Sequence, residues 1–148
     1  MLIFSIALGF AVSANAQNKT KPEPVKPKAV LAEQIRASAA YAELIMVRTE
    51  LESNIESLLI DHTESFPKII EDRYHLAMID IALNRVAAVK PAEAGKLTLA
   101  LGKMLVRSAE LETDLWGLKL IYTDGHQEVK LAAKKLAIYE AAIKDILG

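Results

Sequence analysis

The feature that most constrains the fold is a helical periodicity that begins at Ala29. From there on, apolar residues recur at alternating steps of three and four, which places them on one face of an α-helix. No stretch alternates with a period of two for long enough to indicate a strand. The pattern is interrupted at three places, at residues 62–67, 90–91 and 123–126. These breaks predict four helices, over residues 29–62, 68–89, 92–122 and 127–147.

The first and third breaks have the composition of helix-connecting turns. Thr63 and Pro67 lie in the first, and proline suits the first turn of the helix that follows. Thr123, Asp124 and Gly125 lie in the last, where Asp-Gly is typical of a tight turn and Thr or Asp can cap a helix start. We expect both segments to be the turns of helical hairpins.

An internal repeat supports this organisation. Shifting the chain by 60 residues aligns its halves without a gap, so that Glu50-Leu51-Glu52 lies over Glu110-Leu111-Glu112. The two turn segments also fall on each other. The sequence therefore predicts one helical domain, residues 29–148, made of two hairpin repeats over residues 29–89 and 90–148.

The apolar positions of each helix follow a heptad-like spacing that predicts helix–helix seams. In the third helix these positions are Leu97, Leu101, Met104, Ser108, Leu111, Leu115, Leu118 and Tyr122. The predicted fold class is therefore all-α: two repeated antiparallel helical hairpins, coiled-coil-like, after a signal peptide and a Pro-rich linker. Arg48 and Asp72 are charged residues at seam positions, where they either set the register or lie where the stripe drifts and side chains reach water.

The N-terminus resembles a secretory signal. Residues 1–16 are mostly apolar and end in Ala14-Asn15-Ala16 before Gln17, which predicts cleavage after Ala16. The alternative is an uncleaved anchor, but the stretch is shorter than the roughly 20 residues of a spanning helix. Residues 17–28 are rich in proline and lysine, which predicts an extended flexible linker. We expect a periplasmic or secreted protein without stable membrane insertion.

Composition and motifs exclude several function classes. The chain has 18 Lys+Arg against 19 Asp+Glu, whereas nucleic-acid binding needs a basic face. It has no cysteine for thiol catalysis, no Gly-x-Ser-x-Gly elbow and no glycine-rich phosphate loop. We expect no enzymatic activity and no cofactor.

Asp72 and His75 are the candidate metal ligands with helical spacing, and we treat them as surface residues. Their repeat equivalents, Ala132 and Lys135, cannot complete the ligand set of a di-iron bundle. We therefore expect no native metal site. The single tryptophan, Trp116, is either an exposed anchor for a partner or a side chain partly buried at the seam edge.

The segment Tyr122-Thr123-Asp124-Gly125-His126-Gln127-Glu128-Val129 resembles turns in the coiled coils of polysaccharide chain-length determinant proteins, the polysaccharide co-polymerase family. In that family a Glu-Leu-Glu-rich helix ends in a similar turn, and Thr63–Ile69 keeps its proline. The resemblance implies a periplasmic antiparallel coiled-coil hairpin that is used twice. The family's membrane-spanning helices and α/β domain have no counterpart here.

These observations predict an exported, non-enzymatic helical scaffold or adaptor of a bacterial cell envelope, linked through the resemblance to polysaccharide export. Its partner is another protein or a second copy, contacted through helical faces. The alternative is a periplasmic helical-hairpin chaperone or a metal- or stress-sensing protein. The chain lacks the paired Leu-Thr-x-x-Gln motifs of such chaperones.

Overall fold

The computed structural model describes residues 33–148, which form helices and no strand. Four long helices follow one another: α2 (Ala39–Leu58), α3 (Pro67–Ala87), α4 (Leu99–Ile121) and α5 (Gln127–Leu147). A 3₁₀ helix, η1 (Pro91–Lys96), precedes α4. The all-α fold of two antiparallel helical hairpins is thus confirmed. The predicted signal peptide with Ala14, Ala16 and Gln17, and the predicted linker, lie outside the described residues.

The sequence predicts helices that start at residues 29 and 92, whereas the first helices of the two hairpins start at Ala39 and Leu99, where side-chain caps fix them. Residues 33–36 are helical but are separated from α2 by a break at residues 37–38. Ser38 and Thr98 have extended backbones, and their hydroxyl oxygens accept hydrogen bonds from the N–H groups of Tyr41 and Leu101, both at 3.3 Å. The prediction that a continuous helix starts at residue 92 is wrong, because Pro91 opens a short 3₁₀ helix instead.

The repeat is visible in the helix boundaries and in the turns. The first helix of each hairpin begins at residue 39 or 99, and the second spans residues 67–87 or 127–147, so equivalent boundaries are 60 positions apart. Both turns also carry a stacked aromatic pair. The rings of His62 and Phe66 lie 3.9 Å apart, and those of Tyr122 and His126 lie 4.1 Å apart.

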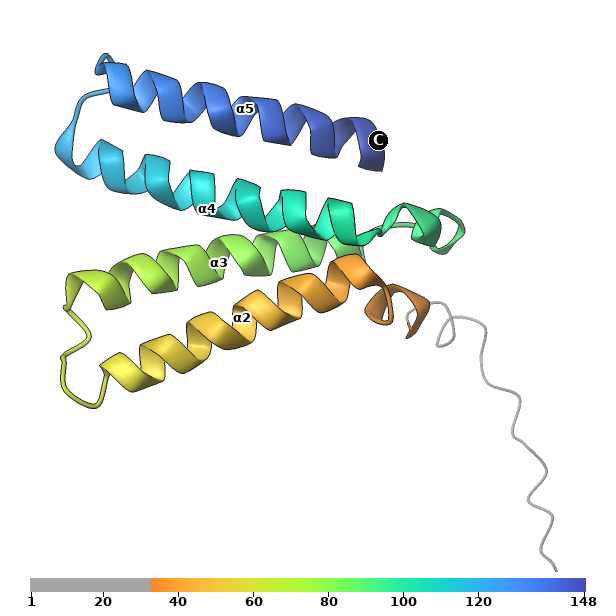
Figure 1. The fold of residues 1–148 in the computed structure, drawn as a ribbon, viewed down its shortest axis with the longest axis horizontal. Coiled ribbons are helices and arrows are strands. Elements are labelled where there is room, and N and C mark those ends of the chain that lie inside the picture. Colours follow the sequence, from red (N-terminus) through yellow and green to blue (C-terminus); the bar gives the residue numbers. More distant parts are fainter. Residues whose placement is uncertain (1–32) are drawn as a thin grey trace, which may run out of the picture.

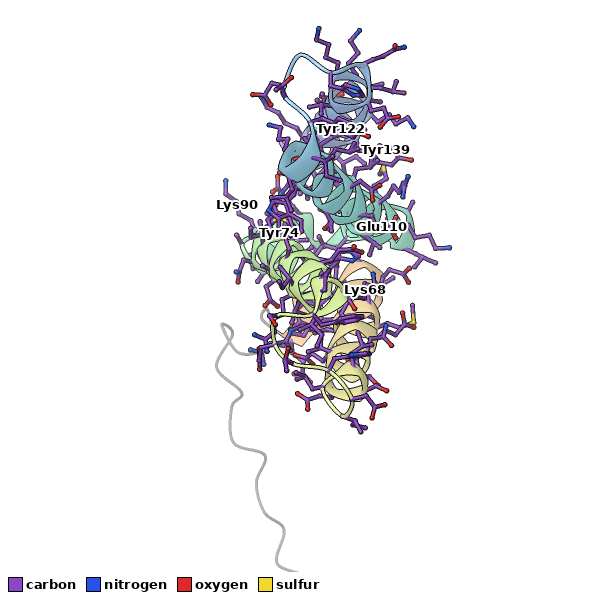
Figure 2. All side chains as sticks on the ribbon, turned by 90° about the vertical axis from the view of Figure 1, so that its left-hand side faces the viewer. Lys68, Tyr74, Lys90, Glu110, Tyr122 and Tyr139 are labelled. Atoms are coloured by element: carbon purple, nitrogen blue, oxygen red, sulfur yellow. The ribbon has the colours of Figure 1, made fainter. Side chains whose placement is uncertain are left out.

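The two hairpins lie side by side, with both turns at the same end of the molecule (Figure 1). The α4 helix packs against α2, α3 and α5, whereas the main partner of α5 is α4. Seen from the turn end, the helices follow one another from α2 to α5, so α5 lies on the outside (Figure 2). The main core fills the space between α2, α3 and α4 and reaches the C-terminal half of α5. Its completely buried large side chains include Leu44, Ile79, Val86, Leu101, Leu105 and Ile143.

The helices α2 and α4 come into close contact at their first turns. A Cβ atom built on Gly102 would lie 2.9 Å from the Cα atom of Ala40, which is closer than real Cβ atoms approach a neighbour. The N–H of Ala40 also donates to the carbonyl of Leu97 at 3.3 Å. Glycine at position 102 therefore allows the backbones of the two helices to meet at their first turns.

We predict that Gly102→Ala lowers the free energy of unfolding by about 1–3 kcal/mol, because the added methyl group meets backbone and the helices must separate. Gly117→Ala is the matched control in the same helix. Nothing lies within 4 Å of its added methyl group, so it should stabilise by about 0.5–1 kcal/mol through helix propensity. Urea unfolding followed by circular dichroism measures both. A Gly102→Ala protein as stable as the Gly117→Ala protein would contradict the close contact.

Candidate functional site

The structure places Asp72 and His75 on the inner face of α3 and not on the surface. Asp72 is only 4% exposed, and Nζ of Lys68 lies 3.0 Å from its carboxylate. The treatment of this pair as surface residues is therefore wrong. Helical drift does not bring Asp72 to water, because this part of α3 packs against α4, where Tyr74 stacks on Trp116.

His75 is half-buried, and its Nε2 atom has no hydrogen-bond partner among the residues that the structure describes. Burial lowers the pKa of His75, although the negative charges of Glu110, Asp72 and Asp114 oppose this shift. Within residues 33–148, no group of three or more His, Asp or Glu side chains is arranged to hold a metal ion. Because Lys68 already neutralises Asp72, Asp72 and His75 have the environment of buried packing residues.

Trp116 joins α3 to α4. Its ring stacks on that of Tyr74, with centroids 4.5 Å apart and an interplanar angle of 12°. The side chain is half-buried. Of the two interpretations drawn from the sequence, the structure agrees with partial burial at the seam edge. The stack also explains why Trp116 is not a freely exposed anchor.

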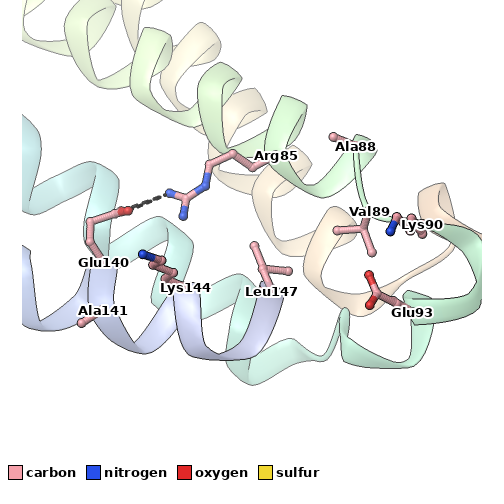
Figure 3. Close-up of a pocket in the computed structure, with 10 residues that line it drawn as sticks. Arg85, Ala88, Val89, Lys90, Glu93, Glu140, Ala141, Lys144 and Leu147 are labelled. Atoms are coloured by element: carbon pink, nitrogen blue, oxygen red, sulfur yellow. Dashed lines mark hydrogen bonds and ion pairs between the residues drawn. The ribbon is translucent and has the colours of Figure 1, made fainter.

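A pocket of about 750 Å³ that is lined by both charged and apolar side chains lies between the C-terminal ends of α3 and α5 (Figure 3). Arg85 donates to both carboxylate oxygens of Glu140 at 3.1 Å, and the hydroxyl of Ser108 donates to one of them at 2.5 Å. Burial raises the pKa of Glu140, but these hydrogen bonds and the Arg85 charge outweigh it, so the net pKa is lowered. The carboxylate is therefore held as an anion by its neighbours and links α5 to both α3 and α4.

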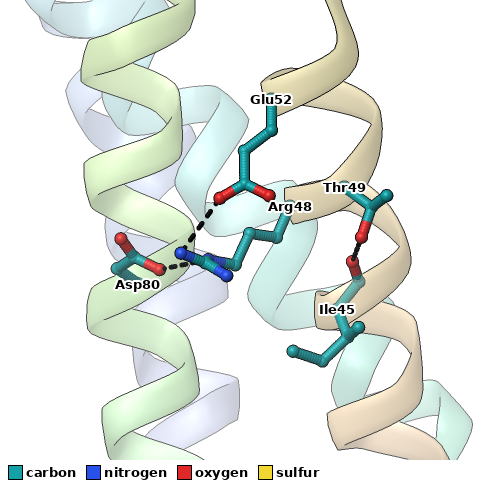
Figure 4. A network of polar contacts seen from close by, with 5 residues as sticks. All are labelled: Ile45, Arg48, Thr49, Glu52 and Asp80. Carbon is teal, nitrogen blue, oxygen red and sulfur yellow. Dashed lines mark hydrogen bonds and ion pairs between the residues drawn. The ribbon is translucent and has the colours of Figure 1, made fainter.

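Arg48 makes an equivalent link between α2 and α3 (Figure 4). Its Nε atom lies 2.9 Å from the Asp80 carboxylate, and Nη2 lies 3.0 Å from that of Glu52. The side chain stays partly exposed. Arg48 thus reaches water and also contacts the opposite helix. Both interpretations of Arg48 made from the sequence therefore apply.

The predicted turn residues lie in exposed loops at one end of the bundle. The N–H of the residue before each second helix, Phe66 or His126, donates to the carbonyl of Thr63 or Thr123 at 2.9 Å. Asp124 pairs with Lys119 at 3.3 Å, and Pro67 is the first residue of α3. The same end exposes large apolar side chains, including Ile60 at 80% and Ile121 at 75%.

A hollow of about 510 Å³ lies along α4 and α5 and has the composition of a binding site. We call it the α4–α5 groove. Its apolar part consists of Leu111, Leu118, Ile121, Leu131 and Ala132. Its charged part consists of Glu71, Arg107, Asp114, Glu128 and Lys135. An apolar floor with charged edges is the form of groove that receives an amphipathic helix.

Sequence reasoning missed this groove. Leu131 is 53% exposed. It lies outside the heptad-like positions of the last helix, which are Val129, Ala132, Leu136, Tyr139, Ile143 and Ile146. An apolar residue off the seam was the available signal, but single exposed leucines are common on protein surfaces. The groove forms between α5 and the side of α4 on which it packs, so it depends on tertiary packing and not on the local sequence pattern.

The chain was compared with protein-family models, with curated proteins and with solved structures, and none of them matches it. Its similarity to chain-length determinant proteins therefore stays a prediction from the turn sequences. Of the helices described, none combines the length and the hydropathy that crossing a membrane requires.

We predict that the free energy of unfolding decreases as the pH falls below about 6.5 and that His75 contributes to this slope. The unfolded chain binds a proton near the ordinary histidine pKa of about 6.5, while burial lowers the pKa in the folded protein. The unfolded state therefore holds more protons in this range, and stability rises with pH. Urea unfolding between pH 5 and 7.5 should show a shallower slope for His75→Gln. The control is His62→Gln, at an exposed turn residue. Equal slopes for all three proteins would show that His75 has no such role.

Proposed function

We propose that this protein is an exported, non-enzymatic helical scaffold or adaptor that binds a protein partner through its helical faces. The observation that carries the proposal is the α4–α5 groove. The corresponding groove of the first hairpin is filled by α4, whereas no helix of the described residues covers the groove of the second hairpin, which Leu131 and Ile121 line. An exposed apolar groove with a charged edge is suited to a helical partner.

The polar clusters support a structural and not a catalytic role. Arg85 balances the charge of Glu140, Lys68 that of Asp72, and two carboxylates that of Arg48. Ser108 adds a hydrogen bond to Glu140. A catalytic acid or nucleophile needs a partner that activates it and an approach for substrate. In these clusters the charged groups satisfy one another, and the clusters around Glu140 and Arg48 connect neighbouring helices.

A second candidate function is a periplasmic helical-hairpin chaperone. The exposed apolar side chains at the turn end favour it, because unfolded clients are held through such surfaces. Ile60 and Leu120 occupy equivalent positions in the two repeats. If the chaperone function is correct, replacing both residues by glutamate would abolish protection of a client in an aggregation assay. If the scaffold function is correct, the same replacement would leave binding at the α4–α5 groove unchanged.

The scaffold function is tested by photo-crosslinking in cells that make the protein. A photoreactive phenylalanine analogue at position 135, in the groove, should form a defined adduct with a protein. We expect Leu131→Glu to reduce that adduct about tenfold, because a charge replaces an apolar side chain that lines the groove. Ile81→Glu is the matched control, because Ile81 is also 53% exposed but lies on α3. No adduct at position 135, or equal loss with both variants, would contradict the proposal.

A further inference from the structure

The way in which α4 fills the first hairpin shows what the second hairpin lacks. Ala40, Leu44 and Leu51 of α2 form one buried cluster with Leu101 and Leu105 of α4. From α3, the cluster takes Ile79, Ala82 and Val86. These side chains are the walls of a groove between α2 and α3, and α4 is the helix that lies in it.

The same groove is present 60 residues further on, without the covering helix. The positions equivalent to Ala40 and Leu44 are Ala100 and Met104, and those equivalent to Ile79, Ala82 and Val86 are Tyr139, Ala142 and Ile146. Ala100 is exposed and the other four are half-buried. The position equivalent to Leu51 is Leu111, which is buried and lines the α4–α5 groove, whereas Met104 and Ile146 pack against the main core.

We propose that α2 of a second copy of this chain occupies the α4–α5 groove, in the way that α4 occupies the groove between α2 and α3 within one chain. This proposal rests on the proposed function and names its partner.

The outward face of α2 has the small side chains that such a contact needs. The positions of α4 that face α2 and α3 include Gly102, Ala109 and Thr113, all buried. Their equivalents in α2, 60 residues earlier, are Ala42, Thr49 and Ser53, and all three are exposed. A shallow hollow lined by Met46, Thr49, Glu50, Ser53 and Asn54 lies on this face. Because Ala42 replaces Gly102, the two helices would be further apart at this level than α2 and α4 are.

Charge complementarity supports the same pairing. Within the chain, Tyr74 stacks on Trp116, and the charge of Glu110 acts on His75. The equivalent pairs between two copies would be Lys134 with Glu56 and Lys135 with Glu50, both of opposite charge. All four side chains belong to exposed residues, and none forms an ion pair within the part of the chain that the structure describes.

The contact is asymmetric, because the groove and the α2 face are different surfaces. Each added copy presents a new open groove, so the contact is heterologous and permits a ring or an open chain of copies. The stacking of α4 on the first hairpin would then continue from molecule to molecule, as in repeat proteins.

The test uses charge reversal and the mass of the purified protein in sedimentation velocity. The wild-type protein should grow beyond a dimer as its concentration rises. The groove variant, Lys134→Glu with Lys135→Glu, and the face variant, Glu50→Lys with Glu56→Lys, should each associate about tenfold more weakly, because each attraction becomes a repulsion. Lys130→Glu with Lys144→Glu is the control, since it makes the same change of charge elsewhere on α5.

Mixtures of the variants identify the asymmetric contact. The two variants together should regain association in an alternating order, because the intact groove of one meets the intact face of the other and the two charge-reversed surfaces also attract each other. A chain that carries all four substitutions should regain self-association.

A symmetric dimer that survives both variants, or a wild-type protein that stays monomeric at millimolar concentration, overturns the inference. If the monomeric protein still forms the adduct at position 135 with a different protein, the proposed function stands and only the second copy is refuted.

Discussion

The contact between α4 and the groove of the first hairpin is the interaction on which the other features depend. It places the backbones of α2 and α4 in close approach at Gly102 and Ala40 and buries the largest apolar side chains of the core. Burial of apolar surface contributes roughly 25 cal/mol per Å², so this core is the main source of stability. Without α4, the two helices of the first hairpin would have no third layer to cover their apolar faces.

The ionic contacts between helices have a different role from the core. Arg48 joins α2 to α3, and Glu140 with Arg85 and Ser108 joins α5 to α3 and α4. Because these side chains are partly exposed, each ion pair adds at most about 1 kcal/mol. These ion pairs define the register of the helices. A charge opposite a fixed partner favours one register of two helices over neighbouring registers, whereas an even apolar stripe does not discriminate between them.

The position of α5 has the most consequence for function. It packs mainly on α4, so the second hairpin buries one side and leaves the α4–α5 groove on the other. In a longer repeat protein the next unit would cover this groove, and no helix of the described residues covers it here. The proposed scaffold function and the proposed head-to-tail contact both follow from this unequal burial of two similar hairpins.

The sequence by itself determined the local structure. The steps of three and four predicted four helices, the turn residues near Thr63 and Asp124 predicted their connections, and the 60-residue offset predicted two equivalent hairpins. These features depend on neighbours in the chain, because helix periodicity and caps are local. Boundaries shifted where a cap competed with the periodic pattern, as at Ser38 and Thr98.

The tertiary structure alone decided that the hairpins lie side by side, that Asp72 is buried, that Trp116 stacks on Tyr74 and that the α4–α5 groove stays open. The physical reason is that the four apolar stripes are similar, and a stripe specifies that a helix face is buried but not which of several similar faces covers it.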